Sequence, residues 1–462
     1  NVSRRIPDYR IASYTKTPDF PEYRLQLGDF FNSSTGRFAS DVDEQLLGGD
    51  FALSKKFKGG KINTEVKAGY FLQHRDRDFA GQSFVYHGAP DDQTLDPAID
   101  LGQDNIDANK LYLVEKTADD LSYYKGESNT QAFYLMANQA FGPKLKAVYG
   151  VRLETFNLEV HNPKTNQKIS KINEDAFLPS LNVTYALTDK TNLRASYFSS
   201  VNRPEFRELA PFSFFVFDKN AEIRGDKNLQ IANLNNVDFR YELYPSNGQL
   251  ISIGGFYKHI KNPIELSLDI TQPFTTFTYQ NEQSADIIGL ELEMKKKLNF
   301  IGGGIFNWMA VYGNVSLIKS NLHFEEGSQA KQDRPLQGQS PYIINARLQY
   351  ENPDNGWTAS ISYNQAGRRI AYVGVDPKYG DTRQDIYEDP RALLDLQVGK
   401  TFGALNVKLT LGDLLHQDLI YYQDGDQDGK YTEQTNISGP HDRLMYFYNA
   451  GFTTNLSVNY TF

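Results

Sequence analysis

The segment LNVTYALTDKTNLRASYF, residues 181–198, alternates apolar and polar side chains on both sides of a short polar turn. Successive side chains of a strand point to opposite faces, so a period of two indicates a strand with one apolar face. Leu181 and Tyr185 lie on that face before the turn, and Leu193 returns to it afterwards. The polar residues 188–190 make the reversal. The segment therefore predicts a β-hairpin whose two strands share one apolar face.

The same alternation recurs along the chain, with Pro, Asn, Asp or Gly where the direction must reverse. Counting the copies gives about sixteen strands, several of them longer than strands of soluble sheets. Short turns alternate with long polar or mixed loops, which is typical of outer-membrane barrels. Short turns are expected at 58–60, 142–144, 188–190, 245–248, 299–304, 352–356 and 403–404, and one strand is expected at 305–320. Long loops are expected near 7–43, 79–122, 162–174, 205–230, 265–282, 321–340, 369–389 and 415–446.

The two faces of these strands differ in chemistry. One is apolar and rich in Tyr, whose ring and hydroxyl suit a lipid–water boundary. A soluble β-sandwich would also alternate, but strand length, the Tyr-rich face and the loop asymmetry favour lipid outside and a lumen inside. We therefore predict an all-β fold, a transmembrane antiparallel β-barrel. Charged side chains expected to face the lumen are Arg152, Glu154, Arg194, Asp238, Arg240, Glu242 and Arg347.

Composition narrows the function classes. The chain of 462 residues has no cysteine, which excludes disulfides, thiolate metal sites and a cysteine nucleophile. Its net charge of −9 disfavours nucleic-acid binding, which needs a basic face. No apolar run approaches the roughly 18 residues of a membrane-spanning helix. Neither a phosphate-binding glycine motif nor a nucleophile elbow is present, and the seven histidines lack metal-site spacing, so we do not expect an enzyme.

Six segments, in order along the chain, resemble the barrel of TonB-dependent outer-membrane receptors, particularly those of the Bacteroidota type. They are IPDYR (6–10), SSVNRPEFRELAPFSFFVFD (199–218), GDKNLQIANLNNVDFRYELYP (225–245), IIGLELEMKKKL (287–298), RPLQGQSPYIINARLQYEN (334–352) and NLSVNYTF (455–462). The resemblance implies a barrel of 22 strands with a plugged lumen. Residues 1–462 would then be the C-terminal portion of that barrel, with the plug and first strands outside this sequence. A complete sixteen-stranded porin is the alternative that strand count alone leaves open.

Two loops carry candidate binding residues. In QDGDQDGKYTEQ, Asp424, Asp426 and Asp428 alternate before a glycine, with Glu433 following, an arrangement that converges hard oxygens on Ca²⁺. The twelfth position of an EF-hand loop is Thr435, so an EF-hand is rejected, and a looser Ca²⁺ site competes with a solvated acidic loop tip. No cofactor is otherwise required. The second loop would either line a ligand entrance or pack on the barrel mouth, and its aromatic residues are Phe212, Phe214, Phe215 and Phe217.

The resemblance implies energised uptake of a ligand across the outer membrane, with the TonB system acting through the absent plug. Expected partners are outer-membrane lipid, the TonB system, and a surface lipoprotein or other subunits of an outer-membrane complex, but not nucleic acid. The alternative is a structural or secretion-associated barrel subunit without import activity, and a passive porin comes third. The lumen-facing charges would either guide a polar solute or pair with one another. The terminal strand, residues 455–462, would expose Leu456, Val458, Tyr460 and Phe462 to lipid.

Overall fold

The computed structural model describes residues 2–12, 14–17, 20–25, 27, 35–88, 95–115, 123–216, 221–269, 276–324, 334–375, 384–433 and 441–462. Strands dominate these residues. The helices are short: α1 (Pro97–Asp100), α2 (Gln103–Asp107), α3 (Phe206–Leu209) and the 3₁₀ helix η3 (Gly304–Trp308). Within this part of the chain no helix has the length and apolarity to cross a membrane.

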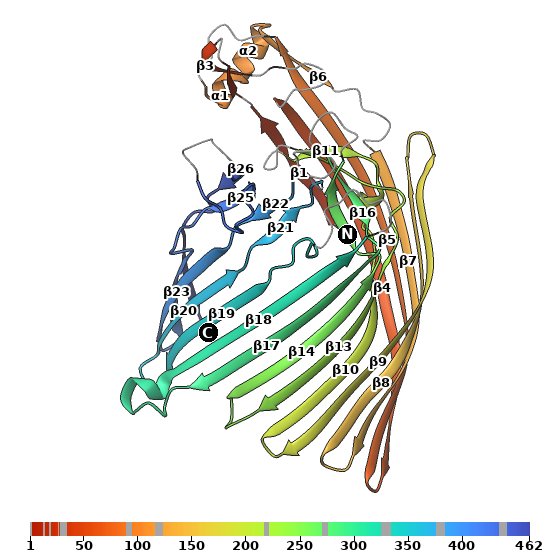
Figure 1. Ribbon diagram of the computed structural model, residues 1–462, viewed down its shortest axis with the longest axis vertical. Helices are drawn as coiled ribbons and strands as arrows, with labels where there is room; N and C mark the ends of the chain where they lie inside the picture. Colours follow the sequence, from red (N-terminus) through yellow and green to blue (C-terminus); the bar gives the residue numbers. More distant parts are fainter. Residues whose placement is uncertain are drawn as a thin grey trace.

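One antiparallel sheet contains 17 strands and follows chain order (Figure 1). Sixteen strands pair in series and β6 (Leu111–Glu115) pairs beside β7 on β5. Among the described residues β1 pairs with β4 and β27 with β24, and no pairing joins β1 to β27. The series is β1 (Val2–Ile11), β4 (Gly36–Gly59), β5 (Ile62–Gly88), β7 (Tyr123–Phe141), β8 (Leu145–His161), β9 (Lys168–Thr188), β10 (Thr191–Asn202), β13 (Ala232–Leu243), β14 (Leu250–Lys261), β17 (Ser284–Lys297), β18 (Met309–His323), β19 (Tyr342–Asn352), β20 (Trp357–Ala366), β23 (Arg391–Phe402), β24 (Leu405–Gly412) and β27 (Thr453–Tyr460).

The hairpin expected at residues 181–198 is confirmed. Strands β9 and β10 pair with Tyr185 opposite Leu193 and Leu181 opposite Tyr197, so the apolar residues share one face. The same holds around the sheet, where large apolar side chains stay exposed on that face, for example Phe239 at 54%, Leu290 at 60% and Leu317 at 55%. A continuous exposed apolar face is expected of a barrel that contacts lipid, not of a soluble sheet.

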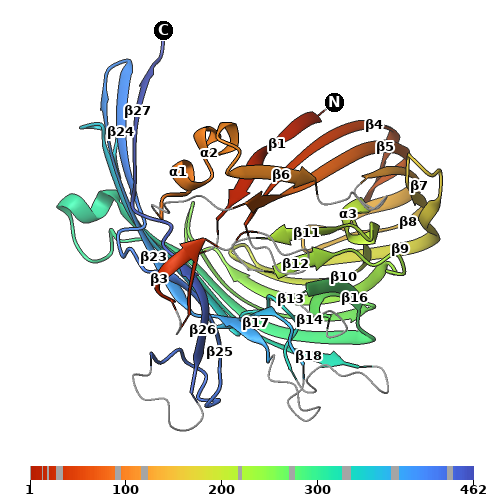
Figure 2. The ribbon, with the colours of Figure 1, turned by 90° about the horizontal axis from the view of Figure 1, so that it is seen from above.

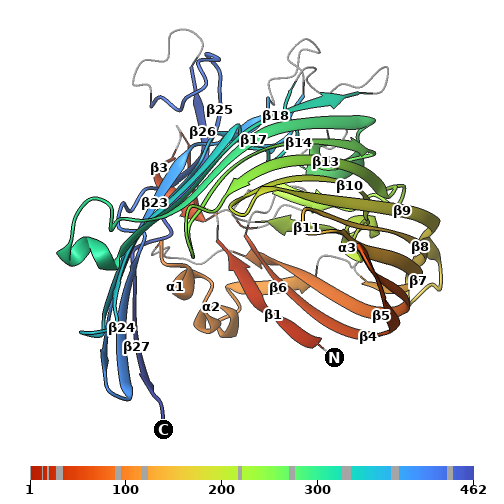
Figure 3. The ribbon, with the colours of Figure 1, turned by 90° about the horizontal axis from the view of Figure 1, so that it is seen from below.

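The opposite face is concave. Figures 2 and 3 show the sheet curving around α3 and strands of the connecting segments. Strand β27 pairs with β24 with Leu456 opposite Leu409, and Leu456, Val458 and Tyr460 are exposed together on the convex face, as expected for the terminal strand. The convex face is therefore the lipid side and the concave face is the lumen side.

Several predicted boundaries are wrong. The strand expected from residue 305 begins at Met309, because residues 304–308 form η3. Three loops were placed too long, since β4 begins at Gly36, β5 continues to Gly88 and β9 begins at Lys168. Those strand ends mix polar with apolar residues, so their alternation is weak, and backbone pairing with neighbours extends the strands beyond it.

Short strands of the long connections build two further sheets at the end of the main sheet opposite the short turns (Figure 1). One contains β11 (Ser213–Val216), β12 (Ala221–Arg224), β16 (Thr276–Asn281) and β15 (Ile264–Leu268). The other contains β21 (Arg369–Tyr372), β22 (Ile386–Glu388), β25 (Leu419–Gln423) and β26 (Arg443–Tyr448). A bridge between Ser267 and Val373 joins them. We call these eight strands the loop assembly; a separate hairpin pairs β2 (Tyr14–Thr17) with β3 (Phe20–Leu25).

Candidate functional site

The seven charged residues predicted for the lumen lie on the concave face, opposite in register to the exposed apolar residues. On β8, for example, Arg152 and Glu154 flank Leu153, which is 50% exposed on the lipid side. All seven pair with side chains on the same or neighbouring strands: Arg152 with Glu154 at 2.5 Å, Arg194 with Glu242 at 2.8 Å, Arg240 with Glu242 at 3.5 Å and with Glu293, Ser196 with Asp238 at 3.1 Å, and Arg347 with Ser360 at 3.0 Å. The wall is therefore an array of charges held in place by neighbours, which supports the pairing interpretation.

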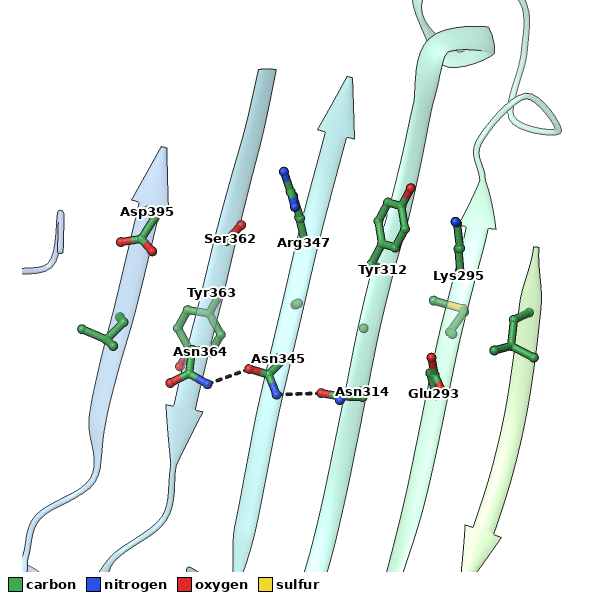
Figure 4. A pocket seen from close by; sticks show the side chains of 15 residues that line it. Glu293, Lys295, Tyr312, Asn314, Asn345, Arg347, Ser362, Tyr363, Asn364 and Asp395 are labelled. Carbon is green, nitrogen blue, oxygen red and sulfur yellow. Dashed lines mark hydrogen bonds between the residues drawn. The ribbon is translucent and has the colours of Figure 1, made fainter. Parts of the chain in front are cut away.

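A recess of about 390 Å³ with a mixed polar and apolar lining opens on this wall across β17, β18, β19, β20 and β23 (Figure 4). Three asparagines form a ladder across it: Asn364 donates to Asn345 at 2.6 Å, and Asn345 donates to Asn314 at 2.7 Å. Arg347 and Asp395 also line this recess. Side-chain amides both donate and accept hydrogen bonds, and Glu293, Lys295, Arg347 and Asp395 add charges of both signs to the lining. The recess therefore offers hydrogen-bonding and charged groups to whatever fills the lumen.

Helix α3 docks on the concave wall through an aromatic ring. Phe206 is 1% exposed, and its ring lies under the guanidinium groups of Arg75 at 5.1 Å and Arg77 at 5.6 Å. Glycine at 126 makes the approach possible, because a Cβ there would lie 2.5 Å from the ring. Glu205 then bonds Arg75 at 3.0 Å, so charge and ring both hold the helix against the wall.

The residue that leads into α3 is also anchored. Arg203 pairs with Glu154 on β8, and its guanidinium lies 4.4 Å from the ring centroid of Phe156. Glu154 therefore joins Arg203 of the loop to Arg152 of the wall. The sequence did not predict this ion pair, because residues 154 and 203 are far apart in the chain and no local spacing connects them.

A buried ion pair ties the loop assembly to the connection after β18. Arg334 and Glu265 have side chains only 1% exposed and pair at 2.7 Å. Gln337 accepts from the Leu266 amide at 2.7 Å and donates to the Ala371 carbonyl at 2.8 Å, bridging β15 and β21. Beneath them Ala221, Ile223, Phe277 and Ile386 form an apolar core drawn from three connections. The assembly is therefore packed and hydrogen-bonded as one unit.

The aromatic candidates are only partly described. Phe212 is 7% exposed and packs against Phe79, with ring centroids 5.2 Å apart, and against Phe38 at 6.2 Å. This agrees with packing on the barrel mouth. The side chains of Phe214 and Phe215, and the whole of Phe217, lie outside the described residues, so a ligand role for them stays a prediction.

The acidic loop brings together a different set from the one predicted. Carboxylate oxygens of Asp424, Asp426 and Asp442 lie within 4.8 Å of one another. Asp428 and Glu433, which the spacing suggested, are not in this group; Asp428 instead accepts the Lys430 amide at 2.8 Å. Asp442 is far from Asp426 in the sequence, so no local spacing motif could predict that the two carboxylates meet.

Two histidines meet one carboxylate on the convex face. His259 of β14 and His323 of β18 both lie 2.8 Å from Asp286 of β17, and the Tyr257 hydroxyl donates to the same group at 2.5 Å. The spacing of the histidines gave no signal, because the cluster forms only across three paired strands. It lies near the strand ends that lead into the long connections, above the exposed apolar residues.

Comparison with protein families decides what this architecture is. The family model described as "TonB dependent receptor-like, beta-barrel" matches residues 5–414, most of the chain. The chain belongs to the TonB-dependent receptors. These are outer-membrane transporters rather than enzymes, so this receptor chain is an outer-membrane β-barrel. A search of curated proteins by sequence found no match.

Solved structures agree on the fold. The unliganded ferric citrate transporter FecA has a TM-score of 0.60 and 15% identity, covering 94% of this chain and 57% of its own. The ferric-catecholate import receptor Fiu of Escherichia coli K12 has a TM-score of 0.58 and 15% identity, covering 98% and 59%. The ferripyoverdine receptor of Pseudomonas aeruginosa has a TM-score of 0.59 and 14% identity, covering 95% and 52%. The receptor chain thus spans about half to three fifths of these neighbours' length.

Proposed function

We propose that this chain forms the transport barrel of a receptor that takes up a ligand across the outer membrane, with energy delivered by the TonB system. The family match supports an outer-membrane receptor, and energised uptake is the step that we add. In this proposal the ligand is captured at the loop assembly and passes along the concave wall. TonB would act through a plug domain inside the barrel.

The observation that carries the proposal is the contrast between the two faces of one sheet. The convex face exposes large apolar side chains, whereas the concave face holds ordered charges and the asparagine recess. A lumen lined by fixed polar groups suits the passage of a polar solute and contact with a plug. The loop assembly on the same side supplies a packed, polar rim.

For the cargo, metal chelates are the first class to test. Three structural neighbours are described as a ferric citrate transporter, a ferric-catecholate import receptor and a copper transporter. Near α3 the concave wall carries Arg75, Arg77 and Arg152, and Arg203 lies in the loop that leads into α3. These four arginines outnumber the carboxylates that pair with them, Glu44, Glu154 and Glu205, and would attract anionic chelates. The aromatic loop that carries Phe214, Phe215 and Phe217 is the place to look for direct ligand contact.

The test is whole-cell uptake of a panel of labelled ferric and copper chelates in the source bacterium. We expect one chelate to be taken up saturably, with uptake lost on deletion of this gene and equally on deletion of TonB. Uptake that survives TonB deletion would favour a passive porin. If no nutrient requires the gene, and mass spectrometry of the purified complex finds secretion subunits, the structural-subunit alternative replaces transport.

A further inference from the structure

The acidic cluster closes the end of a hairpin in the loop assembly. Strands β25 and β26 pair as far as Gln423 opposite Arg443. Asp424 directly follows the first of these residues and Asp442 directly precedes the second, and Asp426 joins them from the turn. Asp424 and Asp442 are each 7% exposed, whereas Asp426 is accessible. Two buried carboxylates and one accessible carboxylate therefore converge where the strands separate.

A separate observation at this place is an oxygen with no partner. One oxygen of Asp424 accepts from Arg368 at 2.7 Å and from the Gly429 amide at 3.2 Å. Its other oxygen, Oδ1, is buried and has no hydrogen-bond partner in the described part of the chain. Burial of a carboxylate oxygen without a hydrogen bond is unfavourable, so this oxygen is an acceptor position that a cation could fill.

The net charge of the cluster has the magnitude of one divalent cation. Three carboxylates carry three negative charges, and Arg368 supplies one positive charge to Asp424, which leaves a net −2. The guanidinium of Arg368 also stacks on Tyr387 at 3.6 Å, so it is fixed beside Asp424 rather than free to move to the others.

We propose that Asp424, Asp426 and Asp442 bind one Ca²⁺ ion at the end of the β25–β26 hairpin. The ligand atoms are all hard carboxylate oxygens, which suit Ca²⁺ and not softer metals. Ca²⁺ accepts irregular sites of six to eight oxygens, so backbone carbonyls and water complete the shell, whereas Mg²⁺ demands a near-ideal octahedron. The charge of the ion matches the net −2.

The ion would fix the hairpin to the rest of the loop assembly. Gly425 already lies so close to the His441 backbone that a Cβ would approach its carbonyl oxygen to 2.0 Å. Binding of Ca²⁺ between Asp424 and Asp442 would hold these two segments together, and Arg368 carries the connection to the residues between β20 and β21. The site does not depend on the transport proposal, since it can be measured without any cargo.

The experiment is a calcium titration by calorimetry on chelator-treated protein, purified from membranes in detergent. We expect one saturable site with a Kd on the order of 10⁻⁴–10⁻³ M, the range of extracellular calcium modules, and weak or no response to Mg²⁺. Asp426→Asn should weaken binding by about tenfold or more, because affinity follows the number of ligand charges. Asp428→Asn is the matched control from the same turn and should leave the Kd unchanged.

Hydrogen exchange of residues 419–448 gives the second measurement, and it confirms that each variant is folded. Added Ca²⁺ should slow exchange at the β25–β26 end in the wild type and in Asp428→Asn, but not in Asp426→Asn. The proposal fails if no saturable calcium binding occurs up to 10-fold above the expected range. It also fails if Mg²⁺ binds equally well, or if both variants lose binding to the same degree.

Discussion

A charge placed on either face of one central strand tests the lipid and lumen assignment directly. In β18, Leu317 is 55% exposed on the convex face and pairs with Leu290, itself 60% exposed. The next residue back, Ser316, points to the concave face and pairs with Glu291. Leu317→Lys would put an ammonium into hydrocarbon, whereas Ser316→Lys would place it beside a carboxylate.

The size of the effect follows from depth. Leu317 lies near the middle of β18, which runs from Met309 to His323, so it is close to the centre of the membrane. A Lys at the midplane on the lipid face costs about 2–4 kcal/mol, which is roughly a 30-fold to 1,000-fold loss in the folding equilibrium. On the concave face we expect a change of about 0.5 kcal/mol or less, since surface substitutions away from special features are usually that small.

The assay is reversible folding into phosphatidylcholine vesicles, with a denaturant titration followed by tryptophan fluorescence and by gel mobility of the unheated protein. Leu317→Ser separates loss of the apolar side chain from addition of charge and should fall between the wild type and Leu317→Lys. Equal destabilisation by Ser316→Lys and Leu317→Lys would refute the assignment of the two faces.

Three further outcomes are expected. Gly126→Leu should displace the Phe206 ring of α3, lower the free energy of unfolding by about 1–3 kcal/mol and speed proteolysis of the loop that carries α3. Gly49→Leu, with open space at its Cβ, should do neither. Glu265→Gln should leave buried Arg334 uncompensated and lower the opening free energy of β15 by about 3 kcal/mol in hydrogen exchange, and combining it with Arg334→Met should recover much of the loss. Burial raises the pKa of Asp442, so protonation stabilises the calcium-free loop as pH falls through that pKa; protection factors corrected for the intrinsic pH dependence of exchange should rise on acidification while calorimetric Ca²⁺ affinity falls.

Alternation was a sufficient signal for the main sheet. At residues 181–198 each side chain's face could be assigned from the sequence, because lipid and lumen impose opposite chemistry on neighbouring positions. The charged wall residues followed from the same rule. Before Met309 the chain forms the helix η3, so the two-residue period does not apply there and the predicted start of the strand at residue 305 was wrong.

The loop assembly and its contacts could not be predicted this way. Strands of four to six residues, such as β12 and β15, are too short for a period to emerge. Their pairing depends on connections far apart in the chain, as do the meeting of Asp424 with Asp442 and that of Phe206 with Gly126. Such contacts can be predicted only once the fold is known, since no spacing rule links residues that are distant in sequence and adjacent in the barrel.

The hydrogen-bonded continuity of the loop assembly has a practical consequence for receptor engineering. β12 pairs with β16, β15 bridges to Val373 after β21, and β22 pairs with β25, so four connections share paired strands. The connection after β18 joins the same network through Arg334 and Gln337, which makes five. Transplanting a single connection into another receptor would leave strand edges without their partners at both ends of the graft. A chimaera with altered ligand preference should therefore exchange all five connections as one block, and single-loop libraries should be drawn from positions outside the paired strands.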